Sequence, residues 1–567
     1  MMANADETKT VIDYFLENVE KLGDKIFMAQ PMGGGNENIK TFSYKEVLNK
    51  AKKVAGYIES FGYPPKSQIA ICSKNCAYWF IADLGIWLAG HVSVPVYPTL
   101  TAETTRYILE HSESKMVFVG KLDEKPWAEM KKGIPANIDS ISFPLCPKDT
   151  GSAKAWSDVI ETSSPIENPV TRTKDEMATI IYTSGSTGKP KGVMTSYKAM
   201  TDASKGICKS LDIKSDDRYL SYLPLAHSME RWNGLCIPMY SGMQIWYADS
   251  LTTFVADLNR CQPTIFASVP RLWTKFQAGV FTKMSESTIN LLLSIPLVNI
   301  LIKKLLLKKL GLHKVRIAGS GSAPVTEDLL NWYRCLGLEL LEGYGMTENF
   351  NYSHMSRPGH ARVGYVGNSQ NGVDCRIAED GEIQIKSPGK MMGYYKNPEA
   401  TAETITEDGY IRTGDKGSLD NQGRLKITGR TKEIFKTSKG KYVAPSPIEM
   451  ELVSNQHLEL VCVGGKSQPQ PFAILQLLEG PKKKAMASAS EREAIGKDLE
   501  ALLKASNPKF DHHEQLQCLV VVKEDWTPEN GFLTPMQKIK RGTIESIYDH
   551  KVEGWYASKK KVIWDQF

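Results

Sequence analysis

The sequence lacks the features that mark secreted, membrane-spanning and metal-cluster proteins. It contains no uninterrupted apolar run of about 18 residues, so we expect no membrane-spanning helix. Residues 1–7 do not combine a basic start with an apolar core, so we expect no signal peptide. The ten cysteines are scattered, and the nearest pair, Cys72 and Cys76, has neither zinc nor redox spacing. We therefore expect reduced cysteines and a cytoplasmic location.

An excess of one charge is also missing. The net charge of +6 is small for 567 residues and gives no indication of nucleic-acid binding. Hydrophobic residues make up 41% and charged residues 24% of the chain, as in soluble globular enzymes. A chain of this length exceeds one ordinary domain, and no internal repeat is evident. The composition shifts near residue 430, so we predict domains over residues 1–429 and 430–567.

Strand and helix patterns alternate through the first part of the chain. Apolar runs at residues 68–72 and 92–96 predict two buried strands, and residues 77–88 between them predict an apolar helix. Strand patterns recur at residues 264–269 and 314–319. Such alternation is typical of a layered α/β domain. The sequence therefore predicts an α/β fold for the larger domain.

One segment, residues 289–312, joins an apolar stretch to a group of lysines. Residues 291–302 are almost all apolar, and leucines then alternate with Lys303, Lys304, Lys308 and Lys309. A basic amphipathic segment can lie on an anionic membrane surface, which gives a peripheral membrane contact through residues 289–309. A helix packed on the domain, with its lysines in solvent, has the same pattern. The sequence leaves both interpretations open.

The stretch at residues 181–192 carries the clearest chemical pattern. It follows an apolar strand and combines hydroxyls, glycines and a lysine in one loop. Glycine lets backbone N–H groups turn toward an anion, and hydroxyls add donors, so the loop suits a polyphosphate. A flexible linker has a similar composition, and the Walker pattern is excluded because Pro190 follows Gly188-Lys189. The predicted phosphate contacts are Thr183, Ser184, Gly185, Ser186, Thr187, Gly188 and Lys191.

Further blocks follow in order, at residues 221–232, 319–324, 341–348, 393–401, 408–415, 429–436 and 531–541. With the loop, they resemble the adenylate-forming superfamily, and most closely the long-chain fatty acyl-CoA synthetases. That family activates a carboxylate with ATP. The resemblance extends from about residue 12 to the last block. It implies a large multi-sheet α/β adenylation domain and a smaller, mobile α+β C-terminal domain.

The resemblance implies how the nucleotide and its metal ion are held. Tyr344 offers an aromatic face to the adenine, and the carboxylate of Asp415 can accept two hydrogen bonds from the ribose hydroxyls. Glu348 and Thr183 are hard oxygen ligands that suit Mg²⁺. The implied nucleotide contacts beyond the loop are Gly321, Ser322, Glu342, Gly343, Tyr344, Thr347, Asp415 and Arg430.

Other residues are assigned to the acyl substrate and to catalysis. By resemblance, His227 in Leu223-Pro224-Leu225-Ala226-His227 lines the carboxylate site, and Trp232 and Gly345 border the acyl group. The implied catalytic residues are Lys538, His227 and Thr347. Lys540 competes with Lys538 for the role of catalytic lysine, since Gln537 stands where many relatives have glycine.

The resemblance also implies a second reaction step at the start of the smaller domain. Lys432 occupies the hinge position, where backbone torsions change as that domain rotates. Lys436 and Tyr442 fall near positions that contact CoA in some relatives, although one extra residue in 437–441 shifts the alignment.

We therefore expect a fatty acid, a long-chain one by the closest resemblance, to be converted by ATP to acyl-AMP and then to acyl-CoA. The alternatives are an aromatic or shorter acid, and a carrier protein as acceptor. A nonenzymatic acyl or nucleotide binder would be expected to have lost Glu348, Asp415 or the terminal lysine. The sequence indicates no oligomeric state.

Overall fold

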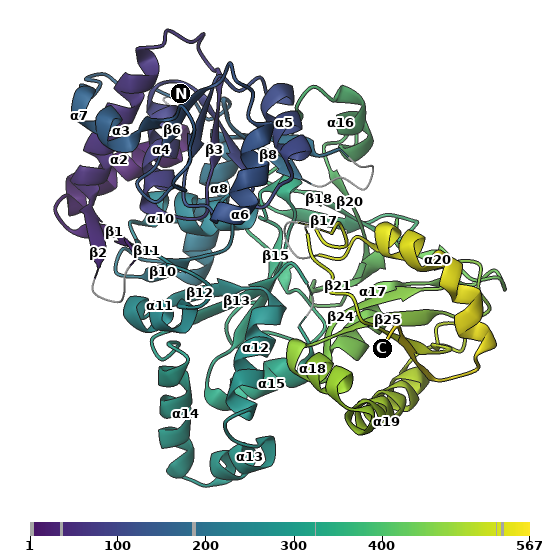
Figure 1. Ribbon diagram of the computed structural model, residues 1–567. Helices are drawn as coiled ribbons and strands as arrows, with labels where there is room; N and C mark the ends of the chain where they lie inside the picture. The colour runs from purple at the N-terminus through teal and green to yellow at the C-terminus, as the bar shows by residue number, and fades with distance from the viewer. Residues whose placement is uncertain (1–4, 34–37, 184–188, 324, 529, 535–537) are drawn as a thin grey trace. The chain divides into compact units, whose positions relative to one another are not determined.

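The computed structural model describes residues 5–33, 38–183, 189–323, 325–528, 530–534 and 538–567 (Figure 1). They form two compact units. Unit 1 contains Met1–Cys375 and Gln384–Arg412, and unit 2 contains Arg376–Ile383 and Thr413–Phe567. The chain therefore enters unit 2 briefly before residue 384 and finally after residue 412. The domain boundary at residues 429 and 430 stays a prediction.

One sheet of unit 1 has eight strands in the order β19-β9-β8-β4-β3-β5-β6-β7. Strands β3 and β4 pair in parallel, and helix α4 between them is buried along its whole length. These three elements have the bounds that the apolar runs predict. The bounds are β3 Gln68–Cys72, α4 Ala77–Leu88, β4 Val92–Val96, β5 Met116–Val119, β6 Asp139–Ser142, β7 Lys154–Ala155, β8 Met177–Thr183, β9 Lys191–Ser196 and β19 Gly393–Tyr394.

A second sheet of unit 1 has nine strands in the order β16-β15-β14-β13-β12-β10-β11-β1-β2. Its central strands β10 to β14 pair in parallel, apart from the antiparallel β15 and β16 at one edge and β2 at the other. Their bounds are β1 Ile26–Pro31, β2 Ile39–Ser43, β10 Arg218–Ser221, β11 Gln244–Tyr247, β12 Ile265–Ser268, β13 Ile317–Gly321, β14 Leu340–Tyr344, β15 His354–Met355 and β16 Asn368–Ser369.

Helices connect the strands of both sheets. Phe266 of β12, Trp273 of α12 and Tyr333 of α15 pack in one core, and all three are buried. Further helices of unit 1 are α1 Ala5–Thr8, α2 Val11–Leu22, α3 Tyr44–Glu59, α5 Ala102–His111, α6 Glu124–Met130, α7 Trp156–Thr162, α8 Tyr197–Leu211, α9 Ser228–Arg231, α10 Ile237–Ser241, α11 Phe254–Cys261, α12 Pro270–Phe281, α15 Glu327–Leu336 and α16 Pro398–Thr404.

A buried ion pair joins elements of the two large sheets. Arg231, in the helix that follows β10, lies 2.7 Å from Asp83 of α4 through Nη1 and Oδ2, and neither side chain is exposed. Its Nη2 also donates to the hydroxyl of Ser93 on β4, at 2.6 Å. The guanidinium lies over the ring of Trp87. Each charge therefore has its partner within the core, as a buried charge requires.

The apolar and basic segment forms two helices rather than one. Helix α13 (Glu286–Ser294) and helix α14 (Val298–Lys309) are separated at Pro296, which cannot donate a backbone hydrogen bond. Figure 1 shows both helices beyond α12 and α15, on the side away from the strands. Ile289 is buried, but α14 has no buried residue. Partial burial of Leu293, Leu306 and Leu307 attaches the pair to the core of unit 1.

Unit 2 contains a sheet in the order β24-β25-β26-β27, flanked by helices. Leu475, Val521 and Ile448 lie in its core. The mixed arrangement agrees with the expected α+β fold. Its elements are β24 Leu458–Gly464, β25 Phe472–Leu477, β26 Leu519–Val522, β27 Val562–Asp565, α17 Pro445–Val453, α18 Glu479–Ala487, α19 Ala489–Ser506 and α20 Arg541–Ala557. A four-stranded sheet contains β17 Asp374–Ile377, β18 Glu382–Lys386, β20 Ile411–Leu419 and β21 Leu425–Arg430, and β22 Phe435–Lys436 pairs with β23 Tyr442–Val443.

The sequence predicts reduced cysteines and no membrane-spanning helix. All ten cysteines are described, and each is a free thiol. No helix among the described residues has both the length and the apolar character needed to cross a membrane.

Candidate active site

The predicted phosphate loop connects two paired strands of unit 1. Thr183, the last residue of β8, is the register partner of Lys191, the first residue of β9. Ser184, Gly185, Ser186, Thr187 and Gly188 lie outside the described residues. The ammonium of Lys191 lies 5.1 Å from the centre of the Tyr394 ring, a cation–π distance. Lys191 is therefore held at the strand end where a phosphate charge is expected.

Glu348, the predicted metal ligand, lies next to this lysine. It belongs to a short turn, Thr347–Asn349, directly after β14. The hydroxyl of Tyr394 donates to Oε1 of Glu348 at 2.7 Å, and the backbone N–H of Met391 donates to the Glu348 carbonyl oxygen at 2.7 Å. Oε2 accepts no hydrogen bond from the described residues. A half-buried carboxylate with one open oxygen fits Mg²⁺, which uses few protein carboxylates together with phosphate and water.

Thr347 connects this turn to the predicted acyl-carboxylate segment. Its hydroxyl lies 3.1 Å from the hydroxyl of Ser228, the residue after His227. The imidazole Nδ1 of His227 accepts the backbone N–H of Met229 at 3.1 Å, so it caps the short helix α9. The structure thus brings His227, Thr347 and Glu348 into one part of unit 1. Their catalytic and substrate roles stay predictions.

The segment before His227 is fixed by Asn75 and Glu230. The side chain of Asn75 donates to the carbonyl oxygen of Leu223 at 2.6 Å and accepts the N–H of Leu225 at 3.0 Å. Glu230 is fully buried and accepts hydrogen bonds from Ser221 at 2.6 Å and Tyr219 at 2.7 Å. Burial raises the pKa of Glu230 to about 8, although these hydrogen bonds oppose the shift.

Two residues, Trp232 and Gly345, are predicted to contact the acyl group. Trp232 is buried, edge-on to the ring of Tyr352, and its indole N–H has no hydrogen-bond partner among the described residues. It begins a π-helical turn, Trp232–Cys236, a feature that is frequent at functional sites. A Cβ on Gly345 would lie 2.5 Å from the carbonyl oxygen of Asn351, so glycine is needed there for packing alone. The substrate roles of Trp232 and Gly345 are untested.

The predicted adenine contacts lie at the ends of β13 and β14. Gly321 is the register partner of Gly343, and a Cβ on Gly321 would lie 3.1 Å from the Gly343 carbonyl oxygen. Ser322 adopts a φ of 68°, which turns the chain after β13. The ring of Tyr344 follows at the end of β14, near the ring of His354. Small residues at these positions would permit the close approach of a flat ring, and the adenine contacts stay a prediction.

Glu342 lies beside these residues with its carboxyl group buried. Its Oε2 accepts the backbone N–H of Val325 at 3.2 Å. Burial raises the pKa of Glu342 to about 7, and this hydrogen bond only partly opposes the shift. Near neutral pH the carboxyl group is therefore divided between its neutral and charged forms.

In unit 2 the predicted ribose ligand is paired with the predicted nucleotide arginine. Asp415 and Arg430 are register partners on β20 and β21, and Arg430 Nε lies 3.1 Å from Asp415 Oδ1. Asp415 is buried, whereas the Arg430 side chain is 57% exposed. The carboxylate is therefore fixed while much of the guanidinium stays accessible.

Lys538 lies within electrostatic range of both residues and of Glu433. Two hydrogen bonds with Thr534 hold its backbone: the N–H of Thr534 donates to the Lys538 carbonyl oxygen at 2.7 Å, and the Lys538 N–H donates to the Thr534 hydroxyl at 3.2 Å. The Lys538 side chain is exposed. Lys540 instead supplies the N-cap position of α20. The choice of Lys538 over Lys540 as the catalytic lysine stays a prediction.

The predicted CoA contacts also lie together in unit 2. Lys436 and Tyr442 are register partners on β22 and β23, and the Lys436 ammonium lies 5.5 Å from the Tyr442 ring centre. The Tyr442 side chain is largely exposed. Lys432, the predicted hinge, lies between β21 and β22 and is also exposed. Their functional roles are not tested by this geometry.

Sequence reasoning missed the role of Tyr394. The block at residues 393–401 was recognised by resemblance, but nothing in its spacing showed that this tyrosine contacts both Lys191 and Glu348. The antiparallel pairing of β19 with β9 creates that contact. Conservation of a tyrosine beside the glycine would be the signal to seek.

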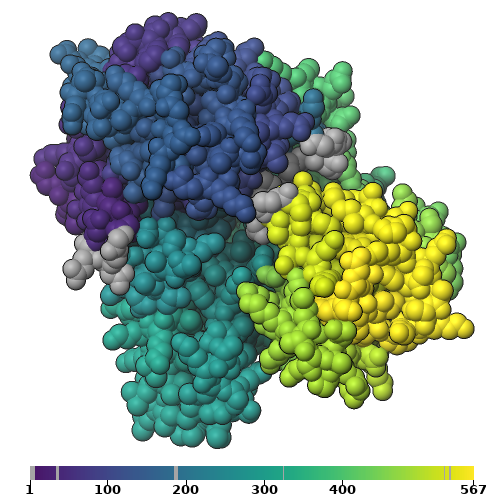
Figure 2. All heavy atoms as spheres, viewed as in Figure 1, coloured from purple at the N-terminus to yellow at the C-terminus, as the bar shows by residue number. Residues whose placement is uncertain are grey.

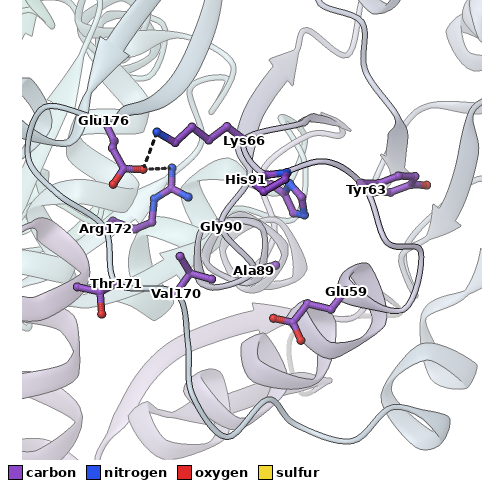
Figure 3. A pocket seen from close by; sticks show the side chains of 11 residues that line it. Glu59, Tyr63, Lys66, Ala89, Gly90, His91, Val170, Thr171, Arg172 and Glu176 are labelled. Carbon is purple, nitrogen blue, oxygen red and sulfur yellow. Dashed lines mark ion pairs between the residues drawn. The ribbon is translucent and has the colours of Figure 1, made fainter.

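A separate cavity of about 420 Å³ in unit 1 is lined by none of the predicted site residues that the structure describes (Figure 3). Three of its charged groups pair with one another: Glu176 lies 3.1 Å from Arg172 Nη2 and 3.7 Å from Lys66 Nζ. Burial, aided by the charge of Arg172, lowers the pKa of His91 to about 4. The cavity is therefore distinct from the candidate active site.

Residues 15–395 match the family described as AMP-binding enzyme, and residues 432–560 match the AMP-binding enzyme C-terminal domain. The chain belongs to the AMP-binding enzyme family. Long-chain-fatty-acid–CoA ligase FadD15 of Mycobacterium bovis is 29% identical over 90% of this chain and 91% of its own length. Human long-chain-fatty-acid–CoA ligase 1 is 29% identical over 91% of this chain and 82% of its own length. The predicted family is confirmed.

Solved structures of other AMP-binding enzymes share the fold. The anthranilate CoA ligase AuaEII, in complex with anthranoyl-AMP, has a TM-score of 0.79 at 18% identity and covers 96% of this chain and 98% of its own. The adenylation domain of a carboxylic acid reductase from Segniliparus rugosus has a TM-score of 0.79 at 21% identity and covers 97% and 94%. The predicted fold class is confirmed.

Replacing Glu342 with glutamine tests the buried carboxyl group. The pKa of Glu342 is raised to about 7 in the folded protein, so between about pH 4.5 and 7 the unfolded chain loses the Glu342 proton while the folded protein keeps it. The free energy of unfolding therefore falls as the pH rises through this range. Glu342→Gln should remove this loss, which amounts to at most about 1.4 kcal/mol per pH unit. Urea unfolding at several pH values measures it, with the exposed Glu327→Gln as control. Parallel curves for Glu342→Gln and the wild type would contradict the assignment.

Proposed function

We propose that this AMP-binding enzyme activates a long-chain fatty acid with ATP and transfers the acyl group to CoA. The observation that carries the proposal is the grouping of Lys191, Tyr394 and Glu348 beside Thr347 and His227. It provides a cation for phosphate and an oxygen ligand for Mg²⁺ next to a segment suited to a carboxylate. The relatives named as long-chain-fatty-acid–CoA ligases support the choice of substrate.

In the first step the fatty acid carboxylate attacks the α-phosphorus of ATP, and pyrophosphate leaves. A carboxylate is already nucleophilic, so catalysis consists of positioning the reactants and neutralising phosphate charge. Lys191 binds a phosphate, Thr347 donates a hydrogen bond to it, and Lys538 stabilises the charge that develops at the α-phosphate. Mg²⁺ held by Glu348 and Thr183 would supply further positive charge at the phosphates. Asp415 orients the nucleotide through the ribose hydroxyls.

In the second step the CoA thiol attacks the acyl carbonyl carbon, and AMP leaves. We assign the hinge to Lys432 and the CoA contacts to Lys436 and Tyr442, whose ammonium and ring already lie together. Rotation about Lys432 would withdraw Lys538 after the first step. His227 would face the acyl carboxyl group in both steps.

We further propose a cytoplasmic enzyme that contacts anionic membranes through residues 289–309. Leu291, Leu297 and Leu301 are 63%, 78% and 69% exposed, an unusual concentration of large apolar side chains in solvent. The segment from Glu286 to Lys309 has four lysines and only one acidic residue, Glu286. In Figure 2 this segment is the lower end of the teal surface. Exposed leucines among lysines suit an anionic lipid surface.

Incubation of the purified protein with ATP, Mg²⁺, CoA and a series of carboxylic acids tests the reaction. We expect AMP and acyl-CoA to form fastest with long-chain fatty acids. Fastest turnover of an aromatic acid would favour the second candidate, which the fold shared with the anthranilate CoA ligase suggests. Pyrophosphate release without acyl-CoA would indicate a carrier protein as acceptor and contradict the second step.

The Lys538→Ala variant tests the catalytic lysine. We expect acyl-AMP formation to fall by about 100- to 1,000-fold, the effect of removing one stabilising donor from a reaction centre. Thioester formation from supplied acyl-AMP should be unchanged, because Lys538 acts only in the first step. Lys540→Ala is the matched control, and a larger loss in that variant would transfer the role to Lys540. Equal losses of both half-reactions in Lys538→Ala would refute the assignment.

Vesicle co-sedimentation tests the membrane contact. The wild-type protein should bind vesicles containing phosphatidylglycerol and not vesicles of phosphatidylcholine alone. Leu301→Ser combined with Leu305→Ser should weaken binding by about tenfold or more, from the lost transfer of two apolar side chains. Leu251→Ser, at a leucine that is 87% exposed elsewhere in unit 1, should bind as the wild type does. Equal binding by all three proteins would refute the contact through residues 289–309.

A further inference from the structure

Tyr394 separates the two charged groups of the candidate phosphate and metal site. Its ring faces the ammonium of Lys191 at 5.1 Å, and its hydroxyl donates to Glu348 at 2.7 Å. The described residues show no ion pair between Lys191 and Glu348. One side chain thus satisfies both groups through different parts of its surface.

The backbone fixes Tyr394 in this place. It is the register partner of Val193 on β9, the strand that begins with Lys191. The Tyr394 N–H donates to the Thr401 hydroxyl at 2.9 Å, and the N–H of Tyr395 donates to the Gly192 carbonyl oxygen at 2.7 Å. The Tyr394 side chain is buried. The pairing of β9 with β19 therefore fixes Tyr394 beside Lys191.

The hydroxyl of Tyr394 acts as a donor, because it is directed at a carboxylate oxygen of Glu348. Its hydrogen bond occupies Oε1 of Glu348 and directs the carboxylate, while Oε2 accepts no hydrogen bond from the described residues. Outer partners of this kind orient metal ligands in other proteins.

A direct ion pair between Lys191 and Glu348 would neutralise the groups that the proposed function needs for a phosphate and a metal ion. A tyrosine between them prevents that pairing without adding a charge. Its ring attracts the ammonium more weakly than a carboxylate would, and a phosphate can therefore replace it as the ammonium's main partner.

We propose that Tyr394 is a positioning residue that orients Glu348 as a metal ligand and keeps Lys191 available to phosphate. The inference deepens the proposed function and depends on it. It assigns a role to Tyr394 from its contacts with Lys191 and Glu348, which the family match does not supply.

The Tyr394→Phe variant of the full-length protein tests this role. Phenylalanine keeps the ring against Lys191 and the packing of β19, and it removes only the hydroxyl. We expect Mn²⁺ to bind about 10- to 100-fold more weakly in the presence of ATP, as for other lost outer partners of metal ligands. Electron paramagnetic resonance of free Mn²⁺ measures this affinity without turnover. ATP binding without metal should be unchanged.

Tyr395→Phe is the matched control, because it removes a hydroxyl from the adjacent residue. That hydroxyl lies 3.5 Å from Glu113, away from Glu348. The control should bind Mn²⁺ and ATP as the wild type does. Equal Mn²⁺ affinity in Tyr394→Phe and the wild type would overturn the role of Tyr394. Failure of the wild type itself to bind Mn²⁺ with ATP would instead overturn the proposed function, and the inference with it.

Discussion

The buried pair between Arg231 and Asp83 is the interaction on which the arrangement of unit 1 depends. It connects the helix that follows β10, in the nine-stranded sheet, with α4 and β4 of the eight-stranded sheet. Removing either partner would leave a charge in the core, a cost of about 3–5 kcal/mol. Because Ser228 and Arg231 are the two ends of helix α9, which His227 caps, the same pair sets where the candidate acyl-carboxylate segment meets Thr347.

A second constraint acts through strand pairing. Strand β9 pairs with β8 on one edge and with β19 on the other, so residues some 200 positions apart in the sequence share one sheet edge. Lys191 and Tyr394 come from these strands, and Glu348 joins them through the Tyr394 hydroxyl and the Met391 N–H. The strand order of the sheet thus brings the charged groups of this region together.

Elements with a strong local signal could be predicted from the sequence. The strands at residues 68–72 and 92–96 and the helix at 77–88 have the predicted bounds, because each is a mostly apolar run that is almost entirely buried. The blocks of the candidate site were likewise recognisable. The role of Tyr394 was not, because it arises from pairing between distant strands. The chain passes between the two units more than once, and the composition gives no sign of this. The apolar segment that looked continuous is divided at Pro296 into α13 and α14.

The burial of Glu230 has a consequence for the charge of the whole molecule. The formal net charge of +6 counts every carboxyl group as ionised. With its pKa near 8, Glu230 is mostly protonated at pH 7 and by itself makes the folded protein close to one charge more positive than the unfolded chain. Glu342, with its pKa near 7, adds part of a further positive charge. Folding is therefore accompanied by proton uptake at these two side chains at neutral pH. This proton uptake contributes to the charge difference by which native electrophoresis and ion exchange would separate the folded from the unfolded form.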